Sequence, residues 1–176
     1  VRAGDIITHA WFGYANQVGD ATGFAQGGSP TAAIYAAKTK GVLLDTRMGS
    51  ASLDFVTAVV CLYPLNTVEA GTRLDLLSSD NFSSSAGIGT AKTLPDAMSI
   101  MLGLNKPYNI NYPGAGPIPA FSTLTDLSPA ITIDDVVRAV TQTPGGIIDR
   151  VPLIGTLQVG APGDVSIFEL ETGSFT

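Results

Sequence analysis

The sequence predicts an α/β fold built on a parallel sheet. Short apolar strands alternate with helical stretches through residues 1–150, and repeated strand–helix units imply parallel strands joined by right-handed crossovers. Three strands of this kind are recognisable, which is too few to close a barrel on their own. A half barrel that lacks its early strands fits this pattern, so we predict the C-terminal part of a (β/α)8 TIM-type barrel in residues 1–150 and a different kind of segment in 151–176.

The three predicted strands are short and buried. The first runs from Asp5 to Thr8 and ends on the only histidine of the chain, His9. The second covers residues 42–45 and the third covers 72–77. A strand that delivers an imidazole into a loop at its carboxyl end is how parallel sheets and barrels present catalytic groups.

The predicted helices have recognisable start and stop signals. Ser29-Pro30 places a serine cap before a proline at the first helical position, and Gly41 is a plausible stop for that helix. An apolar helix is expected from about residue 53 up to Pro64, and another over 94–103. Thr132, with an acid three residues later, is a capping box, and Pro144 is expected to end the helix that it starts.

The remaining segments are predicted loops and a final pair of strands. Residues 13–28 and 78–93 are rich in glycine and small polar residues, and 106–128 is a Pro/Gly-rich insertion without periodicity. Residues 155–160 and 164–170 read as two strands joined by Ala-Pro-Gly. The second of them alternates apolar and polar residues, as a half-exposed antiparallel strand does.

Composition limits the partners. Charged residues make up 14% of the chain, and the net charge is -6 with only nine basic residues, so neither nucleic acid nor an anionic membrane surface is expected to bind. Cys61 stands alone and is expected to lie in the core. We expect a cytoplasmic protein. Because the sequence starts at Val1 without an initiator methionine and a strand begins almost at once, we also expect the chain to be part of a longer one.

Two residues at strand ends are candidates for chemistry. His9 follows the first strand, and Asp80 follows the third within a Ser-Ser-Asp sequence. Each also has a plainer reading, His9 as a hydrogen-bonded histidine and Asp80 as a turn aspartate. Asp45, at the end of the second strand, reads as a structural carboxylate that bonds nearby loop amides.

Together these segments resemble the C-terminal half of the amidohydrolase superfamily, in its dihydroorotase-like deacetylase branch. Residues 4–9 are similar to the G-D-I-x-T-H-C strand of that branch, and residues 41–55 to its R-G-V-x-F-D-x-G-H-G-x-G-S-x-x-F segment. Residues 78–80, Ser-Ser-Asp, are similar to its S-T-D, and residues 94–99 are similar to its D-L-P-x-x-M-S. Residues 154–165 look like the tail I-G-T-L-x-x-G-x-x-A-D-V found across the superfamily, which is the most specific part of the resemblance.

The resemblance implies a metal-dependent hydrolase of an amide, cyclic amide or ester bond, with a small-molecule substrate and a small β-sandwich that would begin in 151–176. It implies one or two divalent cations, most often zinc, at the carboxyl ends of the strands. His9 would be a metal ligand. Asp80 would be both a metal ligand and the catalytic carboxylate that accepts the proton of the metal-bound water.

The chain departs from the family pattern at the sixth-strand histidine ligand. Met48 stands at that altered ligand position, with Arg47 directly before it. A thioether is a poor replacement for imidazole on a hydrolytic zinc, and a guanidinium beside the site would disfavour a second cation. The first-strand His-x-His and the fourth-strand lysine of the family are not in this chain, so we expect the 176-residue chain alone to be inactive.

Three interpretations remain open at this level. The first is a metallohydrolase with an altered metal site. The second is a degenerate, non-catalytic barrel half that acts as a scaffold or interaction module, with the N-terminal barrel half of its parent chain as partner. The third is a small unrelated binding domain, which the open edges of a three-stranded sheet argue against. A homo-oligomer is left open.

Overall fold

A computed structural model describes residues 1–10, 32–49, 53, 58, 74–80, 91–104, 131–151 and 154–170. The elements in these ranges run β1 (Ile6–Thr8), α2 (Ala32–Thr39), β2 (Leu43–Arg47), β3 (Leu76–Ser78), α4 (Leu94–Gly103), α5 (Ile133–Val140) and α6 (Gln142–Ile147). The predicted loop 13–28, the insertion 106–128, Cys61 and most of the helix predicted before Pro64 lie outside the described residues.

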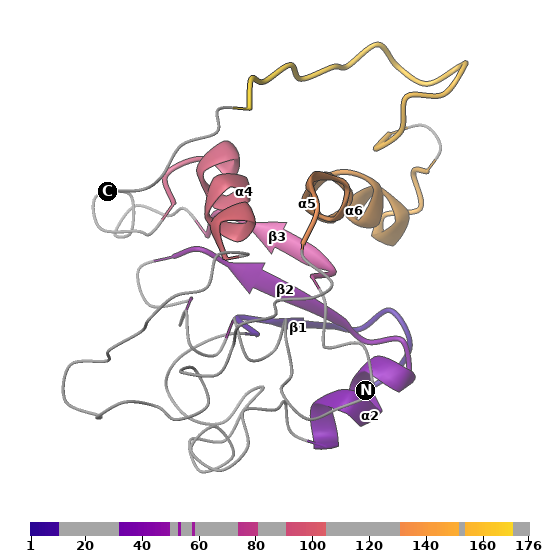
Figure 1. The fold of residues 1–176 in the computed structure, drawn as a ribbon. Coiled ribbons are helices and arrows are strands. Elements are labelled where there is room, and N and C mark those ends of the chain that lie inside the picture. The colour runs from indigo at the N-terminus through magenta and orange to yellow at the C-terminus, as the bar shows by residue number, and fades with distance from the viewer. Residues whose placement is uncertain are drawn as a thin grey trace, which may run out of the picture.

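The three strands form one parallel sheet in the order β1-β2-β3, as the sequence predicts. Thr8 pairs with Asp45 in β2, and Arg47 pairs with Ser78 in β3. Helices α4 and α5 contact β3, and α5 contacts α6, so these three helices lie together on one side of the sheet (Figure 1). The assignment to a (β/α)8 barrel stays a prediction.

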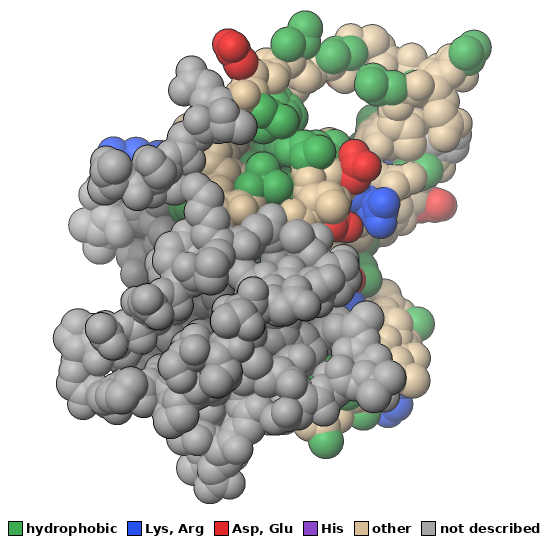
Figure 2. Space-filling view, viewed as in Figure 1, with side chains coloured by type: hydrophobic (Ala, Val, Ile, Leu, Met, Phe, Trp, Pro, Cys, Tyr) green, Lys and Arg blue, Asp and Glu red, His purple; other side chains and the backbone are tan. Residues whose placement is uncertain are grey.

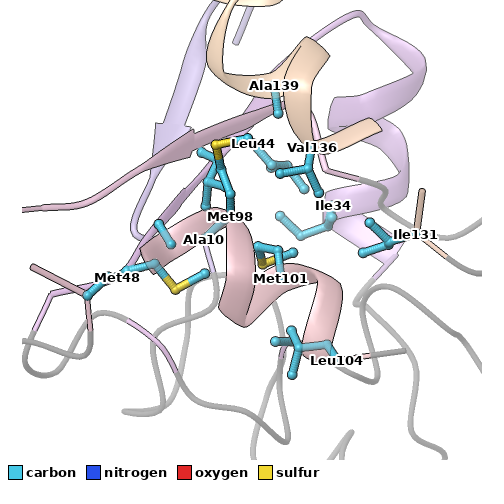
Figure 3. Close-up of a cluster of buried hydrophobic side chains, with 14 residues drawn as sticks. Ala10, Ile34, Leu44, Met48, Met98, Met101, Leu104, Ile131, Val136 and Ala139 are labelled. Carbon is cyan, nitrogen blue, oxygen red and sulfur yellow. The ribbon is translucent and has the colours of Figure 1, made fainter. Parts of the chain in front are cut away.

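The strand β2 sorts its side chains between two environments. Leu44, Thr46 and Met48 are buried, whereas Leu43, Asp45 and Arg47 are half-buried, because successive side chains of a strand point to opposite faces. Leu44 and Met48 join residues of α4 and α5 in one hydrophobic core, drawn in Figure 3. The members labelled there are Ala10, Ile34, Leu44, Met48, Met98, Met101, Leu104, Ile131, Val136 and Ala139.

The capping box predicted at Thr132 is confirmed, a second one that the sequence analysis did not name is found at Thr93, and the predicted start at Ser29-Pro30 lies outside the described residues. Thr93 caps α4 and Thr132 caps α5, each in a reciprocal capping box with the acid three residues later, Asp96 and Asp135. Gly41 ends the turn after α2 at a φ of 81°, and its amide donates to Lys38.

The prediction that Pro144 ends the helical stretch is wrong. The helix α5 stops at Val140, and α6 begins at Gln142 with Pro144 in its first turn. Amides in the first turn of a helix have no partner within the helix, so proline removes nothing there.

The final segment also differs from the prediction. Residues 154–170, here called the C-terminal arm, contain no strand. The amide of Ala161 donates to the Gln158 carbonyl in a turn that ends on the first residue of the expected Ala-Pro-Gly. Figure 2 shows apolar side chains spaced along this arm; Leu157 is 85% exposed and Ile167 is 93% exposed. A strand requires a neighbour to accept its hydrogen bonds, and the described residues supply none here. That residues 151–176 begin a β-sandwich stays a prediction.

None of the helices in the described ranges combines the length with the apolar character that spanning a bilayer requires.

Candidate functional site

The candidate site lies where the three parallel strands end. Because parallel strands share a direction, their carboxyl ends meet at one edge of the sheet. His9 directly follows β1, Arg47 is the last residue of β2, and Asp80 lies two residues beyond β3. Three chain segments that are far apart in sequence therefore bring an imidazole, a guanidinium and a carboxylate together.

His9 and Asp80 converge, as the hypothesis of a shared site requires. The Nε2 atom of His9 lies 3.6 Å from Oδ2 of Asp80. The carboxylate of Asp80 is 9% exposed and the His9 side chain is 36% exposed. The pair is thus open to solvent mainly on the histidine side.

Arg47 lies between these two residues and contacts both. Its Nη1 atom is 2.7 Å from His9 Nε2 and 3.0 Å from Asp80 Oδ1. A guanidinium has donors only, so Nε2 of His9 must be the acceptor in this contact. The proton of a neutral His9 therefore sits on Nδ1, and the Nε2 lone pair points at a positive charge.

Asp45 extends this cluster along the sheet edge. Its Oδ2 accepts a hydrogen bond of 2.8 Å from the Thr8 hydroxyl, and its Oδ1 accepts one of 3.1 Å from the Ser78 hydroxyl. Nε of Arg47 lies 3.5 Å from Asp45 Oδ2, close enough for an ion pair but without a hydrogen bond. The expected structural role fits, although the partners are hydroxyls on both neighbouring strands rather than loop amides.

The backbone at the two candidate residues is unusual. His9 has a φ of 56° and Asp80 a φ of 51°, both in the left-handed region. Residues other than glycine adopt this region uncommonly, with histidine, aspartate and asparagine over-represented among those that do. Backbone held in this region is concentrated at functional sites, and it here turns both side chains out of their strands toward Arg47.

Met48 does not face the site. Its side chain is fully buried and belongs to the hydrophobic core, near Ala10 (Figure 3). Its amide donates to Ser78 and its carbonyl accepts from Ala91, which fixes the backbone on both sides. On β2 it is Arg47, on the opposite face, that reaches the position between His9 and Asp80.

The residues present do not fit a divalent cation while Arg47 is in place. The same guanidinium nitrogen engages the imidazole and the carboxylate that would have to bind the metal. Within the described ranges, no group of three or more histidine, cysteine, aspartate or glutamate side chains is arranged to hold a metal ion. Tight zinc sites use three or four protein ligands, and the cluster offers a positive charge at its centre instead.

Comparison with known proteins adds nothing to this picture, because no protein-family model matches the chain and no curated protein matches its sequence.

The sequence predicts His9 and Asp80 as site residues but places Arg47 only beside the site. The signal that could have found its role is strand alternation. Residues 45 and 47 must share a face of β2, and that face is opposite the one that carries Met48. An arginine on the same face as a strand-end aspartate, between a histidine and an aspartate on the flanking strands, is positioned to bridge them.

Proposed function

We propose that this chain is a non-catalytic barrel half, related to the metal-dependent amidohydrolases, that serves as a scaffold for the remainder of its parent protein. The single observation that carries the proposal is the position of Arg47. Its guanidinium contacts both His9 and Asp80, the two groups that hydrolysis would need free for metal and water.

The open edges of the sheet support the role as a scaffold. β1 and β3 are both edge strands within the described part of the chain. Parallel sheets are nearly always buried, and exposed edges tend to pair with further strands. The N-terminal half of a (β/α)8 barrel supplies strands of the right direction. Pairing with it would complete the barrel around the contacts that Arg47 makes with His9 and Asp80.

The test is a measurement of metal content and hydrolysis on the full chain. After purification in zinc-containing buffer, we expect no retained zinc, manganese or iron by mass spectrometry. We also expect no turnover of N-acetyl amino acids, a dihydropyrimidine or p-nitrophenyl acetate above the rate of Asp80→Asn. Hydrolysis that EDTA abolishes and that Asp80→Asn lacks would overturn the proposal.

A metal-dependent hydrolase of a C–N or ester bond is the second candidate. The convergence of His9 and Asp80 to 3.6 Å at the carboxyl edge of a parallel sheet favours it. For this function Arg47 would have to leave the cluster when metal binds. The same metal and activity measurements, repeated on the parent protein with its N-terminal half, decide between the two candidates.

A further inference from the structure

The C-terminal arm holds most of the large apolar side chains that the described part of the chain leaves in water. Figure 1 shows its second half, drawn in yellow, as an extended chain that runs clear of α4 and α5. Apolar side chains gathered on a surface in this way mark an interaction site. Six of them are each at least 45% exposed: Leu157, Val159, Val165, Ile167, Phe168 and Leu170.

The backbone of the arm is as available for pairing as its side chains. Residues 164–170 form no backbone hydrogen bond with any residue in the described ranges. The segments 155–160 and 164–170 are close enough in sequence to form a hairpin, but an isolated two-stranded hairpin is only marginally stable in water. Because a small sheet needs three or more strands, the arm requires further strands from another source.

We propose that the arms of two copies of this chain pair antiparallel through residues 165–170 and make the protein a homodimer. Each arm then folds as a hairpin, and the two hairpins form one four-stranded sheet. The proposal goes beyond the proposed function, because it assigns an interaction surface and names a second copy of the chain as the partner.

The sequence of residues 165–170 is complementary to itself in one antiparallel register. Residues directly opposite each other share a face of a sheet, and in this register each pair joins side chains of like character. The two-fold axis generates every pair twice, as an interface between identical surfaces requires. The pairs are Val165 with the partner's Leu170, Ile167 with the partner's Phe168, and Ser166 with the partner's Glu169, whose carboxylate can accept from the hydroxyl.

The apolar area of two arms matches what a stable dimer needs. A fully exposed apolar side chain offers roughly 60–120 Å² of surface to bury. At the exposures of the six side chains, two copies together hold roughly 600–1,100 Å² of such surface. A standard interface buries about 1,200–2,000 Å² and is somewhat more than half apolar, so two arms supply the required area without another partner.

Acidic residues limit the pairing to this stretch. Asp164 and Glu171 flank it in the sequence, and in the same register they would meet as like charges across the two-fold axis. Like charges directly opposite each other are destabilising, and charged flanks restrict the further pairing of an apolar strand. Salt screens this repulsion, so the dimer should tighten as the salt concentration rises.

Sedimentation equilibrium of the wild-type chain between about 1 and 100 μM tests the proposal. We expect a concentration-dependent rise from 18.1 kDa to twice that mass; a mass of 18.1 kDa throughout overturns the proposal. Ile167→Ser should raise Kd at least ~30-fold, because the dimer loses the side chain twice. Ile148→Ser, at an exposed position after α6, should leave Kd unchanged. Both side chains are exposed in one copy, so neither variant should lower its Tm.

A charge exchange tests the register. Ser166→Glu places a second acid opposite the partner's Glu169 and should raise Kd about 10-fold, whereas adding Glu169→Lys should restore wild-type dimerisation. A double variant as weak as the single one overturns the register.

Hydrogen exchange identifies which chain pairs with the arm. Protection of the amides of residues 165–170 that rises with protein concentration supports pairing between two copies. Protection that is independent of concentration shows a partner within the same chain and overturns the proposal. Neither measurement depends on metal content or turnover, so its result is separate from that of the proposed function.

Discussion

The substitution Met48→His tests on which face of β2 the candidate site lies. The sequence resemblance places a histidine ligand at this position, whereas the structure buries the Met48 side chain completely in the core. An imidazole at position 48 therefore enters an apolar environment shared with α4 and α5, and it does not reach His9 or Asp80.

The expected cost has two parts. Full burial of a methionine side chain stabilises a fold by about 1.5–3 kcal/mol, and imidazole recovers only part of this. A buried polar group without a partner costs a further ~1–3 kcal/mol. We therefore expect Met48→His to lower the free energy of unfolding by about 2–4 kcal/mol. For a chain of this size that corresponds to a fall in Tm of about 5–15 °C.

The assay is urea unfolding followed by circular dichroism, with and without zinc. Met48→Leu is the matched control, because a volume-conserving apolar exchange costs less than ~1.5 kcal/mol. Zinc should change the stability of neither variant. If zinc stabilises Met48→His and not Met48→Leu, position 48 faces the cluster and the reasoning from strand alternation is refuted.

Three further predictions concern stability. Gly155 has a φ of 79°, and an added Cβ would lie 2.7 Å from the Thr141 carbonyl oxygen. Gly155→Ala should therefore destabilise by about 2–4 kcal/mol in urea melts, whereas Gly160→Ala, at a φ of 92° with nothing within 4 Å, should lose only the left-handed penalty of ~1–2 kcal/mol; equal losses would contradict the steric argument. The Thr46 hydroxyl is buried without a hydrogen-bond partner in the described part of the chain, so Thr46→Val should raise stability by about 1 kcal/mol, and a lower Tm would show that the hydroxyl is bonded. Hydrogen bonds from the side chain and backbone of the α4 cap hold the pKa of Asp96 below its usual 3.8. Its stabilising contribution is therefore present above that value and lost as pH falls through the lowered pKa, so the urea midpoint should drop more steeply below about pH 4 in the wild type than in Asp96→Asn.

Much of the fold could be predicted because its signals are local. The strand β1, the helix α4 and the capping box at Thr132 depend on residues within a few positions of one another, and the structure has them where the sequence places them. The parallel sheet follows from the repetition of strand–helix units. The prediction for Pro144 was wrong because a proline is compatible both with the end of one helix and with the first turn of the next. Here the chain breaks at Thr141, so Pro144 lies in the first turn of α6.

The remainder could not be predicted because it depends on contacts between distant segments. The approach of His9 to Asp80 follows from the direction of the strands, but the insertion of Arg47 between them depends on side-chain geometry at three strand ends. Motif alignment pointed to Met48, since an alignment records position along the chain and not which face of a strand a residue occupies. The two segments of the C-terminal arm have strand-like patterns, yet a pattern provides no pairing partner.

The left-handed backbone at His9 and Asp80 limits which amino acids these positions tolerate. Valine, isoleucine and threonine would strain the chain there whatever their chemistry, whereas asparagine adopts the same conformation readily. Asp80→Asn therefore removes the charge while leaving the main chain undisturbed. In mutational scans of both positions, main-chain geometry should limit the tolerated substitutions to a small group of amino acids. Within that group, the charge of the side chain should rank the variants.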